Sequence, residues 1–258
     1  MFHLVSEVQH NWELIWALAL KELRVRYKRS TLGFLWSLLN PLMTMIILSV
    51  VFSTVARIAV PHYSVFLISA LLPWTFLSQA LAYSAESIVG NGDLLKKVYV
   101  AKSVFPVAAV VSNLINFLLS LIPLLLLLAI LRFPMHLTWA YLPVPLLGLV
   151  LFALGCSFFV AAANVFFRDV SHILQIVLSA WFYLSPVFYS PDLLPPRYLR
   201  VFRFNPMLYI LNGFRHAIYY GFLPKAGNVV MTLLVGVIAL LAGYAFFRRN
   251  EHLFVYYL

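Results

Sequence analysis

Residues 21–41 read KELRVRYKRSTLGFLWSLLNP, a basic stretch that runs directly into an uncharged apolar one. Basic residues beside a membrane span hold that flank in the cytoplasm. If residues 12–28 are helical, five apolar side chains fall within about 80° of one another, and three basic ones lie roughly opposite. The apolar set is Trp12, Trp16, Leu20, Leu23 and Tyr27, and the basic set is Lys21, Arg24 and Lys28. The pattern predicts a cytoplasmic segment 1–30 that contains a helix lying in the membrane surface.

The composition is that of an integral membrane protein. The 258 residues are 64% hydrophobic and 10% charged, with a mean hydropathy of +0.95, whereas soluble domains are about 25% charged. The net charge of +10 comes from short basic clusters between apolar runs, not from a solvated basic face, so nucleic acid is excluded as a partner.

The one cysteine, Cys156, has no intrachain partner for a disulfide or a metal site. No signal-peptide pattern is evident, so we expect the N-terminus to stay in the mature chain.

Six charge-free windows are long enough to cross a bilayer, which takes about 20 apolar residues in a helix. They are residues 32–56, 63–85, 103–131, 137–167, 170–191 and 226–247. The predicted fold class is therefore an all-α integral membrane protein, a single transmembrane domain over residues 1–258. Six spans put both termini on one side. Eleven of the 18 Lys and Arg residues fall on that side, which predicts cytoplasmic termini.

The long loop over residues 188–225 is unusual. It holds five of the seven basic residues on the opposite side, several prolines, and an apolar stretch over residues 207–221 that is too short to span comfortably. We expect re-entrant short helices here, dipping into the outer leaflet. Backbone at membrane depth is tolerated only where it is buried in protein or lines an aqueous cavity. The loop is thus a candidate exit structure, and the alternative is an extracytoplasmic cap with no transport role.

The sequence lacks several kinds of chemistry. All eight carboxylates fall at window ends, in loops or before the first window, whereas ion-coupled carriers need ionisable groups or broken helices at an ion site. No glycine begins a phosphate-binding loop, so any ATPase must be a separate chain. The seven histidines show no metal-ligand spacing, and no Ser/His/Asp set stands out. We therefore predict a transport subunit with no metal or catalytic residue. The competing hypothesis is a membrane enzyme acting on polyprenyl-linked sugars.

Aromatic residues are abundant, with 22 Phe, 14 Tyr and 6 Trp. Trp139, Tyr141, Tyr256 and Tyr257 are interpreted as ordinary anchors at the membrane interfaces. Others crowd windows one, two and five, and flat rings with polar edges can stack on sugars. These are either lipid-facing core or the lining of a glycan conduit. The candidate channel aromatics are Trp36, Phe52, Trp74, Trp181, Tyr183 and Tyr189.

Three blocks of sequence carry a resemblance to a known family. They are RYKRSTLGFLWSLLNP (26–41), NVFFRDVSHIL (164–174), and SPVFY (185–189) followed by Asn205-Pro206 and residues 212–215. In this order, over almost the whole chain, they resemble permeases of the ABC-2 type that export polysaccharides. The resemblance implies export of a lipid-linked glycan across the bacterial plasma (inner) membrane. It also implies a homodimer carrying two copies of an ABC ATPase subunit, which would bind ATP and Mg, with no cofactor in this chain.

The turn Phe166-Phe167-Arg168-Asp169 is more similar to that of O-antigen and teichoic-acid exporters than to that of capsule exporters. This likeness implies a polyprenyl diphosphate carrier. The alternative within the family is an ABC-2 permease for capsule, drug or lipid export.

The resemblance also assigns candidate roles to residues. The basic cluster Arg24, Arg26, Lys28 and Arg29 would recruit an anionic head group, although each residue can equally attract anionic lipid at about 1 kcal/mol. The loop over residues 90–102 would form a short docking helix for the ATPase. Its candidate coupling residues are Leu94, Leu95, Lys96 and Lys97, together with Arg168 and Asp169 in the other cytoplasmic turn. Asp169 could instead cap the fifth span. The candidate extracytoplasmic gate is Asn205, Pro206 and Arg215.

Overall fold

The computed structural model describes residues 2–26, 36–50, 61–98, 100–190 and 202–258, and also residues 195, 197 and 200. Every regular element in these residues is a helix, as predicted. Four helical segments within them are long and apolar enough to cross a membrane: Tyr63–Ser87, Val104–Ile130, Leu137–Phe166 and Ala226–Tyr257.

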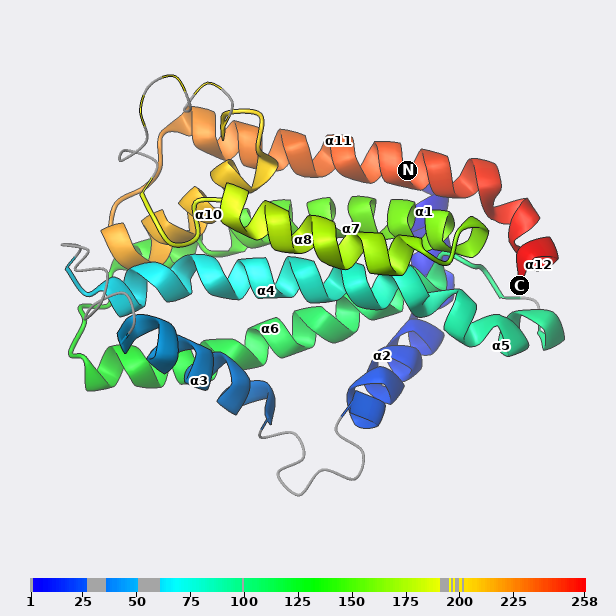
Figure 1. The fold of residues 1–258 in the computed structure, drawn as a ribbon, viewed down its shortest axis with the longest axis horizontal. Coiled ribbons are helices and arrows are strands. Elements are labelled where there is room, and N and C mark those ends of the chain that lie inside the picture. The colour runs from blue at the N-terminus through cyan, green and yellow to red at the C-terminus, as the bar shows by residue number, and fades with distance from the viewer. Residues whose placement is uncertain are drawn as a thin grey trace.

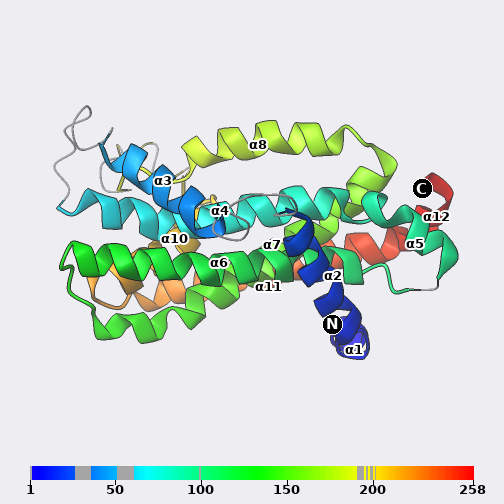
Figure 2. The ribbon, with the colours of Figure 1, turned by 90° about the horizontal axis from the view of Figure 1, so that it is seen from below.

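The chain forms an elongated helical bundle (Figure 1). The helices α1 (Phe2–His10), α2 (Trp12–Arg26) and α3 (Trp36–Val50) come first. The long helices are α4 (Tyr63–Ser87), α6 (Val104–Ile130), α7 (Pro143–Phe166) and α11 (Ala226–Asn250), and α8 (Val170–Leu184) runs along α4 (Figures 1 and 2). The connecting short helices are η3 (Val89–Asn91), α5 (Gly92–Lys97), η4 (Leu137–Tyr141), α10 (Pro206–Arg215), the π-helical η6 (His216–Tyr220), η7 (Glu251–Leu253) and α12 (Phe254–Tyr257).

Most predicted windows correspond to helices. Windows 63–85, 103–131 and 226–247 match α4, α6 and α11 closely, and η4 with α7 fills window 137–167. For the first window, residues 32–35 and 51–56 lie outside the described residues. The fifth helix is shorter than predicted, because α8 ends at Leu184 and not near residue 191. Ser185 has extended backbone (φ −102, ψ 144), the conformation favoured for a residue that precedes a proline.

Helix α4 is the core of the bundle. In its most apolar window 78% of the residues are buried, against 22% in that of α11. A seam of glycines joins α7 to α11: a side chain on Gly155 would overlap the main chain at Ala239, and one on Gly243 would overlap that of Gly155. Small residues at such positions let two membrane helices approach closely.

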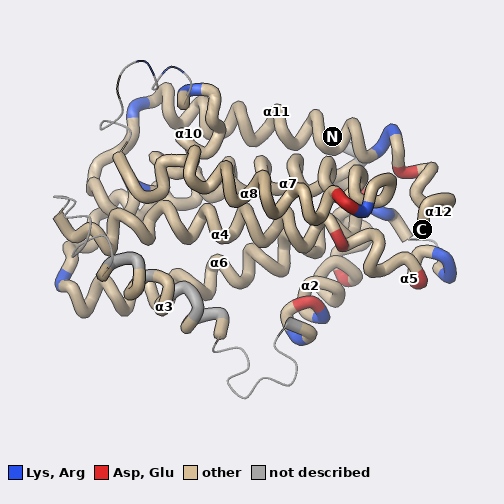
Figure 3. Tube along the Cα trace, viewed as in Figure 1, with Lys and Arg blue, Asp and Glu red and all other residues tan. Residues whose placement is uncertain are grey.

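Charged residues gather at the two ends of the bundle (Figure 3). All acidic residues drawn lie toward the end that holds α5 and α12, with basic residues among them. We call this the charged end. The opposite end, at α10, shows Lys and Arg only among the described residues, and the long helices between are free of charge over most of their length. Both chain ends are near the charged end in Figure 1.

Candidate functional site

Helix α2 packs on the bundle at the charged end. Its inward side chains Ile15, Ala19 and Leu23 are buried, and Ile15 belongs to a hydrophobic cluster that includes residues of α6, against which α2 packs. Trp12 and Trp16 are 49% and 44% exposed, and their rings stack at 6.2 Å. The predicted helix is thus present, but its apolar arc is divided: part of it anchors α2 on the protein and part faces outward.

A groove lies between α2, the ends of α4 and α6, and η3. Its volume is 220 Å³, and its lining is partly polar: Leu18, Lys21, Glu22, Val25, Tyr83, Ser87, Asn91, Phe105, Ala108 and Ala109. Lys21 Nζ donates to Asn91 Oδ1 at 3.4 Å, which links α2 to the segment before α5. No sequence motif had indicated this groove, because its walls come from three separate segments.

The basic cluster predicted for substrate recruitment is only partly within the described residues. Arg24 is exposed on α2, and Arg26 is the last residue of that helix. Lys28 and Arg29 lie outside the described residues. Arg24 projects from the helix that forms one wall of the groove.

The candidate channel aromatics separate into buried and exposed rings. Trp74 is 5% exposed and packs edge-on against Trp181 at 5.6 Å, so its ring fills the core of this chain and faces no open path. Trp181 is half-buried, and its Nε1 donates to Asn205 Oδ1 at 3.0 Å. Tyr189 is also half-buried, whereas Tyr183 and Trp36 are 69% and 47% exposed. Phe52 lies outside the described residues.

The outward face of α8 carries a polar flank. At 100° per residue His172, Gln175, Ser179 and Tyr183 fall within about 80° on the helix, and all four are exposed. The neighbouring outward flank is apolar, with Ile173 and Val177 more than half exposed. Leu174 and Leu178 face the bundle and are buried. Ser179 Oγ donates to Gln175 O at 2.8 Å. An amide without a partner in an apolar medium costs roughly 1–3 kcal/mol, so this flank, with the exposed Gln175 amide, is suited to water or a polar ligand.

Asn205 ties the end of α8 to the start of α10. Its Oδ1 accepts from Met207 N, which caps α10, as well as from Trp181 Nε1, both at 3.0 Å. Its Nδ2 donates to Leu184 O at 3.0 Å and to Ser185 Oγ at 3.1 Å. Pro206 follows as the first residue of α10, where its missing N–H costs nothing. Of the predicted short helices, the structure places α10 and η6 in the described part of the loop.

Arg215 is a buried cation at the same end of the bundle. It is 1% exposed, and its guanidinium lies over the Phe66 ring with Cζ 3.9 Å from the centroid. Nη2 donates to Val187 O at 2.7 Å and Nη1 to Tyr189 O at 3.3 Å. Burial lowers the pKa of Arg215 to about 10, with nearby tyrosines opposing the shift, so the side chain stays charged at neutral pH. It therefore holds the segment after α8 onto α4 and α10.

The two predicted coupling segments both lie at the charged end. The short helix expected in loop 90–102 is present as α5, with Lys96 and Lys97 exposed and Leu94 and Leu95 packed partly inward. In the turn from α7 to α8, Arg168 and Asp169 are exposed. Asp169 occupies the N-cap position of α8, but its side chain makes no capping hydrogen bond.

Asn164 performs the capping that was the alternative role considered for Asp169. Its Oδ1 accepts from Ser171 N at 3.1 Å, and its Nδ2 donates to Ala85 O at 2.8 Å. The side chain is 3% exposed. One amide therefore joins α7, the first turn of α8 and the last part of α4, which leads into α5. Asn164 belongs to one of the sequence blocks that carry the family resemblance, but the sequence assigned it no role. Its contacts with α4 and α8 are visible only in the folded structure.

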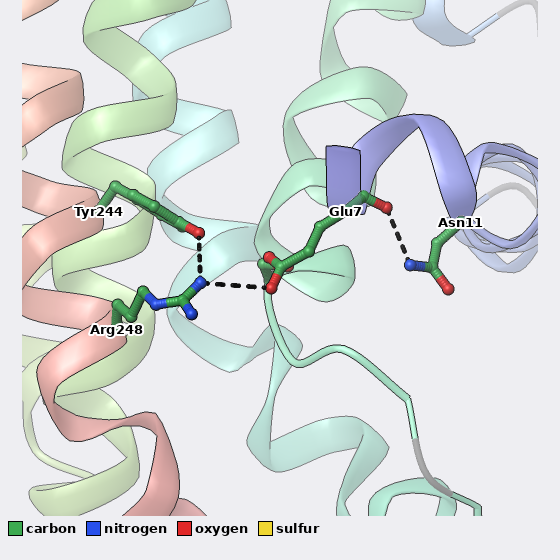
Figure 4. Close-up of polar contacts among 5 residues, drawn as sticks. Glu7, Asn11, Tyr244 and Arg248 are labelled. Atoms are coloured by element: carbon green, nitrogen blue, oxygen red, sulfur yellow. Dashed lines mark hydrogen bonds and ion pairs between the residues drawn. The ribbon is translucent and has the colours of Figure 1, made fainter. Parts of the chain in front are cut away.

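A polar network fixes α1 at the charged end (Figure 4). Glu7 Oε1 lies 3.5 Å from Arg248 Nη1, which also donates to Tyr244 Oη at 3.1 Å. Ser103 Oγ donates to Glu7 Oε2 at 2.9 Å. The network joins the first helix of the chain to the end of α11 and to the residue preceding α6. Within the described residues, no group of three His, Cys, Asp or Glu could hold a metal ion.

These features define a polytopic helical membrane protein with a charged end and a polar flank on one outer helix. The pattern of the ABC-2 type transporter family matches residues 13–219. The chain belongs to this family.

Several named proteins are similar over nearly their full length. The O-antigen export system permease protein RfbA of Myxococcus xanthus is 35% identical over 97% of this chain and 98% of its own. The RfbA permease of Klebsiella pneumoniae is 29% identical over 94% of each chain. The polysialic acid transport protein KpsM of Escherichia coli is 23% identical over 91% of this chain and 92% of its own.

Proposed function

We propose that this chain is the permease subunit of an ATP-driven exporter that carries a polysaccharide across the bacterial plasma membrane. The similarity to O-antigen export permeases supports this function. The structural observation that carries it is the polar flank of α8. A row of His172, Gln175, Ser179 and Tyr183, with no Lys, Arg, Asp or Glu among them, on the outside of a membrane-embedded helix suits a chain of sugar hydroxyls better than it suits lipid.

The transport path forms between two copies of the chain. In each copy α3 and α8 complete a set of six spans, and the polar flank of α8 faces the path. Amide and hydroxyl groups exchange hydrogen bonds with successive sugars, and Tyr183 and Trp36 offer exposed rings for stacking. The absence of Lys, Arg, Asp and Glu from this flank lets a polymer slide, whereas deeply paired charges would trap it.

The substrate is a glycan of the O-antigen or teichoic-acid type, linked to a polyprenyl diphosphate. Its anionic head group is recruited in the inner leaflet by Arg24, Arg26, Lys28 and Arg29, of which Arg24 projects from the helix that forms one wall of the groove between α2, α4 and α6. Charge-assisted hydrogen bonds from Arg and Lys to phosphate are among the stronger polar contacts. At the other end, Asn205, Pro206 and Arg215 position the segment through which the polymer leaves.

Energy comes from two copies of a separate ATPase subunit that binds ATP and Mg and docks on α5 and the α7–α8 turn. The charged end is the cytoplasmic end, because it carries the larger share of basic residues. Both termini then lie in the cytoplasm, which agrees with the Glu7–Arg248 contact between the first helix and the last long one.

The test is reconstitution of the permease with its ATPase subunit and a fluorescent polyprenyl-diphosphate-linked glycan in liposomes. We expect the glycan to stimulate ATP hydrolysis and to become accessible on the far side of the membrane. The matched control substrate is the same carrier without sugars. Equal stimulation and movement of carrier and glycolipid would indicate a lipid transporter, and indifference to both would refute the proposal.

A further inference from the structure

The last helix of the chain, α12, is fixed to the bundle by its buried aromatic side chain. Phe254 is fully buried, and its ring contacts Phe247 at 5.2 Å and Phe166 at 5.9 Å. Lys102 Nζ lies 5.8 Å from the centre of the Phe254 ring. Contacts to α11, to the end of α7 and to the segment before α6 hold α12 in one place, so its outward side chains have a defined position.

Helix α12 lies directly beside α5, the predicted docking helix. Lys96 Nζ donates to the main-chain oxygen of Leu258 at 2.9 Å. The Leu258 side chain lies against Gly92, 3.5 Å from where a Cβ atom would stand on that residue. Figures 1 and 2 show the two short helices next to each other at the charged end.

On its other side α12 adjoins the turn between α7 and α8. The ring of Tyr257 contacts Phe166 at 5.0 Å, and Phe167 is the next residue along the chain. Helix α12 thus lies between the two segments that were predicted separately as coupling elements. Contacts of α12 therefore connect α5 to the end of α7.

The exposed side chains of these three segments are large and apolar or aromatic. Tyr256 is 84% exposed, Phe167 72% and Tyr257 54%. Charges of both signs stand among them: Lys96, Lys97 and Arg168 with Asp93 and Asp169. Exposed aromatic groups mixed with arginine are typical of protein interfaces. Carboxylates on the same surface disfavour contact with the anionic inner leaflet, which argues against the interpretation of Tyr256 and Tyr257 as membrane anchors.

We propose that α12, α5 and the turn over residues 167–169 form a single docking surface for the ATPase subunit, with Tyr256 and Phe167 as its aromatic contacts. This inference rests on the proposed function, because it takes an ATPase to be the partner. Its consequence is that both cytoplasmic turns receive the movement of the ATPase through one rigid body, since α12 contacts both.

The experiment compares retention of the ATPase subunit by the tagged permease purified from membranes. In the double variant Tyr256→Ala/Phe167→Ala we expect about tenfold weaker retention, the loss typical of two interface aromatics. Leu137→Ala is the control: its side chain is 97% exposed and belongs to η4, which precedes α7, whereas the turn over residues 167–169 follows α7 at its other end, and retention should be unchanged. Resistance of each variant to alkaline extraction from membranes reports on anchoring.

The outcomes separate this inference from the proposed function. If the double variant keeps the ATPase while Lys96→Glu/Lys97→Glu loses it, α12 is no part of the surface and only this inference fails. If the double variant keeps the ATPase but becomes extractable from membranes, the rings are lipid anchors and the inference is again refuted. If no variant at α5 or α12 affects retention, docking on α5 fails, and the coupling step of the proposed function fails with it.

Discussion

At the residue scale, Arg215 is a buried cation whose Nη1 and Nη2 donate to backbone carbonyls, and this arrangement predicts a large effect of its removal. Arg215→Met leaves the carbonyl groups of Val187 and Tyr189 without their donor, and we expect a loss of about 3 kcal/mol in unfolding free energy. Thermal unfolding in detergent followed by tryptophan fluorescence measures it. Arg203→Met, which alters an exposed side chain at the same end, is the control. Equal stability of the two variants would contradict the structural role given to Arg215.

Asn164 and Asp169 offer a second comparison between single residues. Asn164→Ala removes a buried hydrogen bond to Ala85 O and a partly buried one from Ser171 N, and should cost about 2 kcal/mol in stability. Asp169→Ala should change stability by less than about 0.5 kcal/mol, because its side chain makes no capping bond. The same unfolding assay decides. A larger loss in Asp169→Ala than in Asn164→Ala would reverse the assignment of the cap.

At the element scale, the polar flank of α8 makes a prediction about transport without a change in folding. Gln175→Leu with Ser179→Leu removes two exposed hydrogen-bonding groups, and we expect glycan export to fall on the order of tenfold, from about 1 kcal/mol per hydrogen bond. The control, Ile173→Leu with Val177→Leu, changes the apolar flank of the same helix. Export rate in liposomes, normalised to inserted permease, is the measurement. Unaffected export by the polar-flank variant would show that α8 does not contact the glycan.

Helix positions could be predicted from the sequence, but helix rotations could not. Charge-free windows located α4, α6, α7 and α11 because charges are excluded from the membrane interior. The fifth window was predicted to run to residue 191, but α8 ends at Leu184. Pro186 favours extended backbone at Ser185, the residue before it, and so ends the helix earlier than the absence of charge suggests. Trp74 and Trp181 were grouped with Tyr183 as candidate channel aromatics, yet Trp74 is buried and Tyr183 exposed. Which face of a helix is outward depends on packing against its neighbours, and this information is absent from a short motif.

At the scale of the whole molecule, the basic cluster Arg24, Arg26, Lys28 and Arg29 has two candidate roles, which are orienting the chain in the membrane and recruiting an anionic head group. The distribution of charge over the chain allows the two roles to be tested separately. Eleven basic residues were assigned to the cytoplasmic side and seven to the other. Five of those seven lie in the loop over residues 188–225, where Arg215 is already buried by folding. Changing Arg24, Arg26, Lys28 and Arg29 to Gln reduces the net charge from +10 to +6 and leaves Lys21, Lys96, Lys97, Lys102, Arg168, Arg248 and Arg249 in place.

If the cluster recruits an anionic head group, the quadruple variant should export several-fold more slowly at low glycolipid concentration and recover at high concentration. Its rate should also respond less to salt, because exposed charges are screened over about 10 Å at 0.1 M ionic strength. Export at 50 and 300 mM salt, with the topology checked by labelling cysteines introduced near each end, measures both effects. Single-residue variants of the same cluster should show smaller losses than the quadruple variant, because each keeps three of the four basic side chains. Normal export and unchanged salt dependence in a correctly oriented quadruple variant would restrict the cluster to orienting the chain and attracting lipid.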